Sequence, residues 1–413
     1  MAFDTALREY VLDRIAEIGG ADLLIGIPTY NSEGTIVGVM REVYAGLEKY
    51  YSDQRCALFV SDGGSLDYTR EMAQRTKSGH VAKIVAIYRG LAGKGTSLRA
   101  IFQAGERLGV KACAVFDSDL RSITPEWVPG LLDPVLSHGF DFVNPNYVRH
   151  KYDGTITNHI AYSVTRALYG RRVRQPIGGD FAFSRKLNDF FAHDDVWDTD
   201  IARFGVDIWM TTVAINEGFR ICETHLGAKI HDAKDPASDL GPMFRQVVGT
   251  LFGMMRRYEK TWRTVRGSEA VPCLGVRQDV APEPVHVNLE ALFDKFRVGY
   301  GHFHALWREI LSPESFAAVT ALASARVPEL ALDPRDWAHV VYDFAYTYDR
   351  WARDRYKLVE IMTPIYYGRL AAFVVETADM STEEAEARVV ERQATVFEEE
   401  KRYLLERFRQ WEQ

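Results

Sequence analysis

The sequence predicts an α/β domain, with a mostly parallel sheet covered by helices on both faces, followed by a mainly α-helical region. Two observations favour this class. From residue 21 to about 145, short apolar runs alternate with loops and helix-period segments, which is typical of parallel strands joined by helical crossovers. After about residue 265, helix-period segments follow one another. A chain of 413 residues usually forms two or three domains, and we expect residues 1–265 and 266–413.

The first domain is expected to contain six strands, four amphipathic helices between them, and a further helix, 204–218, before the last strand. The apolar runs that predict strands are 21–28, 56–62, 82–88, 111–119, 140–145 and 220–232. The amphipathic segments that predict helices are 34–50, 67–78, 95–109 and 125–137. Ligands of such sheets bind beyond the carboxyl ends of the strands. The loops "PTYNSEGT", "SDGGSLD" and "DSDLRS" follow three of these runs, so we expect them to meet at one edge.

The second domain is expected to be helical. It is preceded by a Pro- and Gly-rich stretch, 266–287, that predicts a loop or crossover. The last helix should open with a capping box formed by Ser381 and Glu384. The aromatic residues of this region recur at helical spacing, which favours a helical core within one protomer. An interface of a homodimer is the alternative that stays open.

Composition limits the function. Apolar residues make up 47% and charged residues 26%, and the net charge is −7, so a nucleic-acid partner is not expected. The N-terminus lacks the apolar core of a signal peptide, and we count no apolar segment of the ~18 residues that cross a membrane. The scattered cysteines indicate buried free thiols in a reducing cytoplasm; they are Cys56, Cys113, Cys222 and Cys273.

Asp117 and Asp119 are the first candidate site. They stand one residue apart where an apolar run ends, so both side chains of an extended segment would point to the same face and repel each other. A cation between them removes the repulsion, and carboxylates suit Mg²⁺ or Mn²⁺. A helix N-cap or a plain turn is the structural alternative.

Lys94 lies between two glycines at the start of a predicted helix. Such a position places a positive charge beside backbone donors, which favours a diphosphate; a solvated turn lysine is the alternative. Asp62, in "SDGGS", is suited to a base or ribose, but an Asx turn explains it equally.

Asp180 follows Gly178 and Gly179 in "RQPIGGDFAF". A charged side chain between apolar neighbours costs several kcal/mol unless it is paired, so a functional role is favoured. His231 follows the last predicted strand and could bind a metal as a neutral imidazole, although a lone histidine is usually structural.

In this order, these stretches resemble a GT-A glycosyltransferase of the family-2 type. The set is similar to the synthases of mannosylglycerate, glucosylglycerate and glucosyl-3-phosphoglycerate, which are retaining enzymes. The resemblance rests on specific motifs over roughly residues 20–260. Beyond them, only the general helical pattern of the sequence is similar. It implies an NDP-sugar donor, either a GDP- or a UDP-hexose, and a small hydroxy-acid acceptor.

The resemblance assigns a role to each candidate residue. Asp119 and His231 would bind the divalent cation, Mg²⁺ or Mn²⁺. Asp180 and Asp207, the latter in "FGVDIW", would act at the reaction centre by positioning sugar and acceptor. The nucleotide sugar would be bound by Pro28, Tyr30, Asn31, Glu33, Asp62, Lys94, Asp117, Ser118, Gly178 and Gly179.

The acceptor would be bound by Thr155, Thr157 and Asp207. Thr155 stands where the family has an arginine that helps to hold a phosphorylated acceptor. This departure favours glycerate over phosphoglycerate, although Arg149, His150 or Lys151 could still supply the charge.

We therefore expect a metal-dependent retaining transfer of glucose or mannose to a small hydroxy acid such as D-glycerate. One alternative is an inverting family-2 enzyme that acts on a polysaccharide or lipid carrier, with Asp207 as general base. A second is a nucleotidyltransferase or a non-catalytic protein that binds sugar nucleotides.

Overall fold

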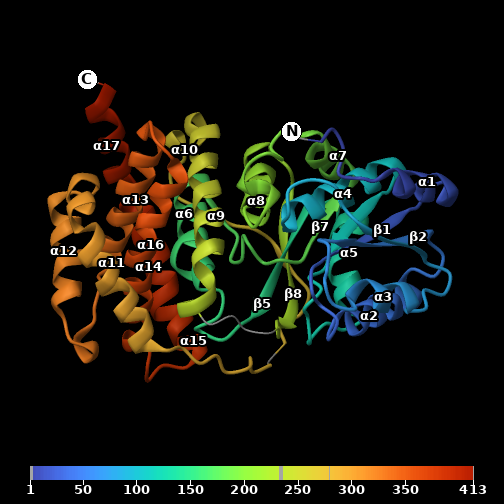
Figure 1. Ribbon diagram of the computed structural model, residues 1–413, viewed down its shortest axis with the longest axis horizontal. Helices are drawn as coiled ribbons and strands as arrows, with labels where there is room; N and C mark the ends of the chain where they lie inside the picture. The colour runs from blue at the N-terminus through green and yellow to red at the C-terminus, as the bar shows by residue number, and fades with distance from the viewer. Residues whose placement is uncertain (1–2, 232–235, 279, 413) are drawn as a thin grey trace. The chain divides into compact units, whose positions relative to one another are not determined.

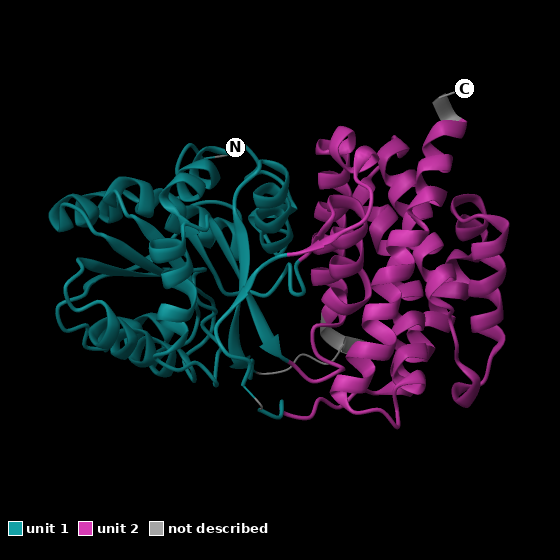
Figure 2. Ribbon diagram, turned by 180° about the vertical axis from the view of Figure 1, so that it is seen from behind, with its two compact units in different colours: residues 1–148, 173–232, 271–282 teal, residues 149–172, 233–270, 283–413 magenta. Residues whose placement is uncertain are grey.

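The structure, a computed structural model, describes residues 3–231, 236–278 and 280–412. The chain forms two compact units, and each is assembled from separate segments (Figure 2). Unit 1 contains residues 1–148, 173–232 and 271–282, and unit 2 contains residues 149–172, 233–270 and 283–413.

Unit 1 is built on an eight-stranded sheet with the strand order β10-β8-β5-β7-β4-β1-β2-β3 (Figure 1). Every neighbouring pair is parallel except the two pairs that β7 makes with β4 and β5. The strands are β1 (Leu23–Thr29), β2 (Cys56–Asp62), β3 (Ala82–Ile87), β4 (Ala112–Val115), β5 (Phe142–Val148), β7 (Phe181–Ser184), β8 (Ile221–Ala228) and β10 (Cys273–Leu274).

Helices cover both faces of this sheet (Figure 1). Every residue of β1 and of β2 is buried, which explains why these strands are continuous apolar runs rather than alternating ones. On one face lie α4 (Lys94–Leu108), α7 (Arg185–His193) and α8 (Val206–Asn216); on the other lie α2 (Ile36–Tyr50), α3 (Thr69–Arg75) and α5 (Trp127–His138). Two further elements of this unit are α1 (Glu9–Ile18) and the short η2 (Asp200–Ala202).

The fold class is confirmed, with small differences at the strand ends. The run 111–119 forms a strand only over Ala112–Val115, so Asp117 and Asp119 lie in the loop beyond it. The run 220–232 forms a strand over Ile221–Ala228, and residue 232 lies outside the described residues. The crossover 266–287, apart from residue 279, contains two very short strands, one of which extends the sheet as β10.

The antiparallel strand β7 was not expected. It places Val115 opposite Phe181 and Ala112 opposite Ser184. The chain therefore enters β7 at the edge where β4 ends. As a result, the residue before β7, Asp180, lies beside the loop that follows β4.

Unit 2 is mainly helical. Its longer helices are α9 (Pro236–Arg257), α11 (Leu289–Ile310), α12 (Pro313–Ser324), α13 (Pro334–Arg350), α14 (Arg355–Glu376), α16 (Glu391–Glu399) and α17 (Lys401–Glu412). Shorter elements are η1 (Thr157–Ala161), α6 (Tyr162–Tyr169), β6 (Arg171–Arg172), α10 (Glu259–Thr264), β9 (Glu269–Ala270), η3 (Val327–Glu329), α15 (Thr382–Ala385) and η4 (Glu386–Val390). The capping box of Ser381 and Glu384 is present at the start of α15.

The boundary between the units differs from the single one expected after residue 265. Residues 149–172 belong to unit 2 because α6 packs against α16. Residues 233–270 also belong to unit 2, where α9 packs against α14. These contacts link segments that are far apart along the chain, so the local pattern of apolar and polar residues does not predict them.

Helix α14 bears on the expectation that no apolar segment reaches the ~18 residues that cross a membrane. Among the described helices it is the one with sufficient length and hydropathy. Its charged residues, such as Arg369, interrupt the apolar run in the sequence. In the structure 78% of its most apolar window is buried, which is also what a core helix of a globular unit shows.

Candidate active site

Asp117 lies just beyond β4, and two lysines hold its carboxylate. Lys94 Nζ is 2.8 Å from Oδ1, and Lys229 Nζ is 2.8 Å from Oδ2. Burial alone would raise the pKa of Asp117, but the two ammonium groups hold it well below its usual range. The Asp117 carboxylate is therefore ionised. The two lysines offset the repulsion between Asp117 and Asp119.

Lys94 is the first residue of α4. Besides Asp117, its ammonium contacts Asp207 Oδ2 at 3.2 Å and the carbonyl oxygen of Gly179 at 3.3 Å. Burial would lower the pKa of Lys94, but Asp117 and Asp207 outweigh burial and raise it. Lys94 therefore carries a positive charge at the edge where ligands of such sheets bind.

The glycines on either side of Lys94 allow a close approach of two backbone segments. A Cβ on Gly95 would lie 1.8 Å from the carbonyl oxygen of Ile201, and a Cβ on Gly93 would lie 2.6 Å from that of Ala202. The N–H of Gly95 donates to the carbonyl oxygen of Arg203. The glycines thus permit close packing of residues 201–203, and that N–H already has a partner within the protein.

Lys229 follows β8 and was missed by sequence reasoning. Its ammonium donates to Asp117 Oδ2, to Asp180 Oδ2 at 2.7 Å and to the carbonyl oxygen of Gly178 at 2.9 Å. Its side chain is only 4% exposed. The signal that could have found it is a lysine directly after an apolar strand, in "GAKIHD", because burial of such a charge requires carboxylate partners.

Asp180 is fully buried, and both of its oxygens have partners. Oδ1 accepts from the backbone N–H of Asp117 at 2.7 Å, and Oδ2 accepts from the Tyr147 hydroxyl and from Lys229. A Cβ on Gly179, whose φ is +95°, would lie 2.2 Å from Asp117 Oδ2. Asp180 thus orients Asp117 and Lys229 through these bonds. A side chain at position 179 would clash with Asp117, so glycine is required there.

Asp207 lies in the first turn of α8 and is the carboxylate with a vacant acceptor position. Oδ2 contacts Lys94, whereas Oδ1 is buried and has no hydrogen-bond partner among the described residues. Burial raises the pKa of Asp207, and Lys94 offsets only part of that effect. A buried oxygen without a partner is costly, so a ligand group that donates a hydrogen bond would stabilise this position.

The segments that contain Asp119 and His231 pair with each other. Leu120 and His231 form an antiparallel bridge, and the N–H of Arg121 donates to the carbonyl oxygen of Ile230. Burial and the adjacent Asp117 raise the pKa of Asp119, and the opposing effects of Lys229 and His231 offset only part of this rise. Within the described part of the chain, the Asp119 carboxylate makes no hydrogen bond and no ion pair.

This pair fits a divalent cation. The described residues contain no group of three or more His, Cys, Asp or Glu side chains arranged around one metal position. Mg²⁺ is, however, typically bound by one or two carboxylates together with phosphate oxygens and water. Asp119 supplies a carboxylate that forms no ion pair within the described residues, and His231 supplies an imidazole near it.

The charge balance of the cluster points the same way. Four carboxylates face two ammonium groups, so two negative charges are in excess if all are ionised, which matches one divalent cation. The members of this cluster, which we call the carboxylate–lysine cluster, are Lys94, Asp117, Asp119, Asp180, Asp207 and Lys229.

Three of the expected nucleotide-binding residues, Tyr30, Asn31 and Glu33, lie in the loop after β1, which hydrogen bonds join to the loop after β2. Asn31 Oδ1 accepts from the N–H of Leu66 at 2.9 Å, and Glu33 Oε2 accepts from the N–H of Tyr68 at 3.0 Å. Tyr30 is 58% exposed, so its ring is available for stacking. Pro28 lies within β1.

Asp62 is part of an Asx-type turn. It is fully buried, its Oδ2 accepts from the N–H groups of Gly64 and Ser65, and its Oδ1 accepts from the Ser65 hydroxyl. The structural alternative for Asp62 is thus what the structure contains. Ser118 is also bonded within the protein, through its hydroxyl to that of Ser32 at 2.9 Å.

Thr155 and Thr157 belong to unit 2 and are both buried. The Thr155 hydroxyl is hydrogen-bonded to the Tyr366 hydroxyl at 2.7 Å. Thr157 begins η1, a π-helical turn; such turns are frequent at functional sites.

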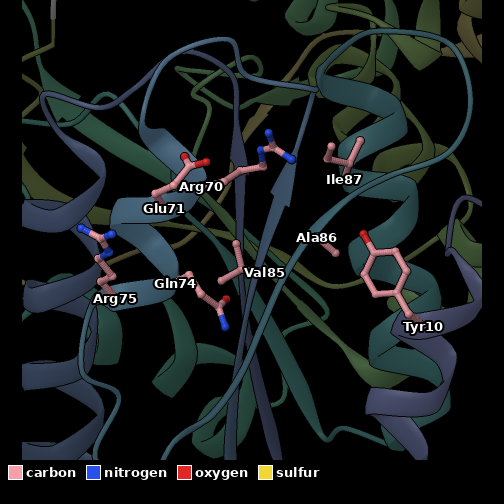
Figure 3. A pocket seen from close by; sticks show the side chains of 8 residues that line it. All are labelled: Tyr10, Arg70, Glu71, Gln74, Arg75, Val85, Ala86 and Ile87. Atoms are coloured by element: carbon pink, nitrogen blue, oxygen red, sulfur yellow. The ribbon is translucent and has the colours of Figure 1, made fainter.

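A surface cavity of about 340 Å³ lies elsewhere in unit 1, between α1, α3 and β3 (Figure 3). Its lining includes Tyr10, Arg70, Arg75 and Val85. None of its lining residues belongs to the carboxylate–lysine cluster. It has one link to the nucleotide loops, because Arg70 Nε is 3.5 Å from Asp62 Oδ2.

Comparison with known proteins assigns a class to part of the chain. Residues 24–197 match the model of glycosyl transferase family 2. This stretch is a family 2 glycosyltransferase domain, and the chain is a glycosyltransferase. No curated protein matches it.

Solved structures of glucosyl-3-phosphoglycerate synthase from Mycobacterium tuberculosis are similar to part of the chain. The complex with Mn²⁺, UDP and glucosyl-3-phosphoglycerate is 27% identical, covers 59% of this chain and 83% of that one, and gives a TM-score of 0.46. The complex with Mg²⁺ and UDP is 26% identical, covers 60% and 85%, and gives a TM-score of 0.45. Likeness at this level does not assign a substrate to this chain.

Proposed function

We propose that this glycosyltransferase moves a hexose from a nucleoside diphosphate sugar to a small hydroxy acid such as D-glycerate, with a divalent cation and with retention of configuration. The observation that carries the proposal is the carboxylate–lysine cluster. Its two excess negative charges suit a cation, and Lys94 suits the diphosphate that the cation would help to bind.

The residues of the chain would divide the work as follows. Asp119 and His231 hold the cation, which when bound stabilises the charge that develops on the departing diphosphate. Lys94 donates to the same diphosphate. Asp117, held by two lysines, would orient the nucleotide sugar, and Asp207 Oδ1 would accept a hydrogen bond from the acceptor hydroxyl. Asp180, whose oxygens are both occupied, would act only by positioning.

The surroundings of Thr155 support an acceptor without a phosphate. Lys151 Nζ donates to the carbonyl oxygens of Thr377 and Met380, both at 2.6 Å. Arg149 is paired with Asp153 at 3.3 Å. Burial lowers the pKa of His150, so this imidazole is neutral at pH 7. The three residues that could replace the family's arginine are thus engaged or uncharged, which favours glycerate over phosphoglycerate.

One observation favours a second candidate, an inverting transferase. A general base works best when its pKa is near the operating pH, and burial raises the pKa of Asp207. Asp207 would then remove the proton of an acceptor hydroxyl rather than only orient it. The anomeric configuration of the product, read from the proton coupling constant by NMR, separates the two candidates.

The direct test is acceptor-dependent release of nucleoside diphosphate. The protein is incubated with UDP- and GDP-hexoses and Mg²⁺ or Mn²⁺, with and without D-glycerate, 3-phosphoglycerate and other small hydroxy acids. Release that requires a hydroxy acid supports the proposal. Binding of the nucleotide without release would instead indicate a non-catalytic binding protein. A parallel incubation with UTP or GTP and a hexose 1-phosphate tests the nucleotidyltransferase, which would release pyrophosphate as it forms the nucleoside diphosphate hexose.

Asp119→Ala tests the metal site. We expect loss of Mn²⁺ binding and a fall in turnover of at least roughly 100-fold, with folding intact because Asp119 makes no hydrogen bond within the described residues. Mn²⁺ affinity by calorimetry and circular dichroism are the measurements. Full turnover of the wild type in EDTA would contradict the metal requirement.

We also propose a cytoplasmic location. Cys56, Cys113 and Cys222 are free and buried, as expected, whereas Cys273 is exposed. Free thiols persist in reducing compartments.

A further inference from the structure

Lys94 and Lys229 bind Asp117 in parallel ways. Each ammonium has one Asp117 oxygen, one oxygen of another carboxylate and one backbone carbonyl oxygen of the Gly178–Gly179 pair as neighbours. A lysine has three N–H groups, so both ammonium groups are saturated by the protein. A diphosphate can therefore engage Lys94 only if it displaces one of these contacts.

The two lysines differ in how tightly they are held. The Lys229 contacts measure 2.7, 2.8 and 2.9 Å, and its side chain is 4% exposed. The Lys94 contacts to Asp207 and Gly179 are longer, 3.2 and 3.3 Å, and its side chain is 15% exposed. The contact between Lys94 and Asp207 is thus among the weakest in the cluster and among the most accessible to a ligand.

Asp207 is the residue that this contact affects most. Lys94 neutralises its Oδ2, and its Oδ1 is buried with no partner in the part of the chain that the structure describes. When Lys94 moves away, Asp207 loses the ion pair at its Oδ2, and its need for a hydrogen-bond donor increases.

We propose that Lys94 is a latch that couples the two substrates: with no donor bound it occupies Asp207, and the diphosphate of the donor draws it away and readies Asp207 for the acceptor hydroxyl. This inference rests on the proposed function, since it assumes a nucleoside diphosphate donor. It predicts that donor binding strengthens acceptor binding and that the donor binds first.

The coupling has a definite sign because binding linkage is reciprocal. Withdrawal of Lys94 from Asp207 costs free energy while no acceptor is present. The acceptor recovers that cost when its hydroxyl donates to Asp207. Couplings of this kind usually change affinity by about 5- to 150-fold, and we expect roughly tenfold here.

The first experiment is calorimetry with UDP and Mn²⁺ as donor-site probes and D-glycerate as acceptor probe; GDP replaces UDP if the release assay selects it. For the wild type, we expect D-glycerate to bind about tenfold more tightly when UDP and Mn²⁺ are present. Equal affinity with and without UDP would overturn the latch. Initial-rate patterns give a second readout, because a dead-end acceptor analogue should inhibit uncompetitively against the donor.

The variant that breaks the latch is Lys94→Met. Its Asp207 is released permanently, so D-glycerate should bind the ligand-free variant more tightly than it binds the ligand-free wild type, even if UDP no longer binds. The double variant Lys94→Met/Asp207→Asn should lose this gain. Unchanged or weaker binding of D-glycerate to ligand-free Lys94→Met would overturn the proposal.

Arg107→Met is the matched control, since it removes an exposed positive charge from the last turn of the same helix. It should leave the coupling as in the wild type, and circular dichroism verifies the fold of each variant. The two proposals fail in different ways. Absence of any hydroxy-acid-dependent release contradicts the proposed function, whereas release with no coupling between UDP and D-glycerate contradicts the latch alone.

Discussion

The two sides of Asp117 contain the same chemistry but are held differently. On one side, Lys229 and Asp180 form a buried unit with short contacts and a third donor from Tyr147. On the other side, Lys94 and Asp207 make a longer contact beside a vacant acceptor position. The difference indicates that one ion pair fixes the geometry of Asp117 and that the other is available for exchange with substrates.

The largest effect should come from Lys229→Met, which removes the fixed ion pair. Asp180 is fully buried, and a buried charge that loses its partner costs roughly 3–5 kcal/mol. Urea unfolding measures the loss. Lys94→Met is the matched comparison and should cost clearly less, because its side chain is more exposed. Equal losses for the two variants would show that the two sides do not differ in rigidity.

The next largest effect should be on the pH dependence of stability, and it comes from the buried carboxylate of Glu223. Glu223 on β8 accepts from Asn146 and from the N–H of Arg174, and burial raises its pKa from 4.5 to about 7. The folded state binds this proton more tightly than the unfolded chain does. Its contribution to stability is therefore present below pH 4.5 and is lost as the pH rises through about 7.

A pKa difference of about 2.5 corresponds to roughly 3 kcal/mol. Glu223→Gln should remove this pH dependence, so its stability relative to wild type should improve between pH 4.5 and pH 8 in urea titrations. Glu48→Gln, at an exposed position of α2, is the control and should change nothing. A parallel pH profile for wild type and Glu223→Gln would contradict the expectation.

The smallest effect should come from Tyr147→Phe, which weakens the fixed side without removing a charge. The hydroxyl donates to Asp180 Oδ2, while the ring packs against Trp127 with centroids 5.2 Å apart. Phenylalanine keeps this packing. Hydrogen bonds to charged groups contribute about 1.5–3 kcal/mol, and we expect the low end because Asp180 keeps Lys229. No change in urea unfolding would show that Lys229 alone holds Asp180.

Much of this arrangement could be predicted from the sequence, for reasons that particular residues show. The runs at 21–28 and 56–62 form strands because both of their faces are buried, and a continuous apolar run encodes that. The bridge that joins Leu120 to His231 follows from two loops that end at the same edge of the sheet. A local pattern sufficed for the strands, whereas the proximity of Asp119 and His231 was expected only from the family resemblance.

The rest depends on contacts that no local pattern encodes. Strand β7 has four residues, too few for a clear alternation, yet its antiparallel direction is what brings Asp180 to Asp117. Lys229 is a single lysine, and its importance appears only when its three acceptors are known. The glycines beside Lys94 suggested room for a phosphate, but what requires them in the structure is the close packing of residues 201–203.

The carboxylate–lysine cluster joins segments that are far apart along the chain, with sequence separations of 49 for Asp180 and Lys229 and 113 for Lys94 and Asp207. Closing loops of that length costs entropy before the contacts can form. The charges should therefore come together late in folding, when the sheet already exists, and water solvates them until then. Ligands that bind only the completed cluster would then slow unfolding rather than speed folding.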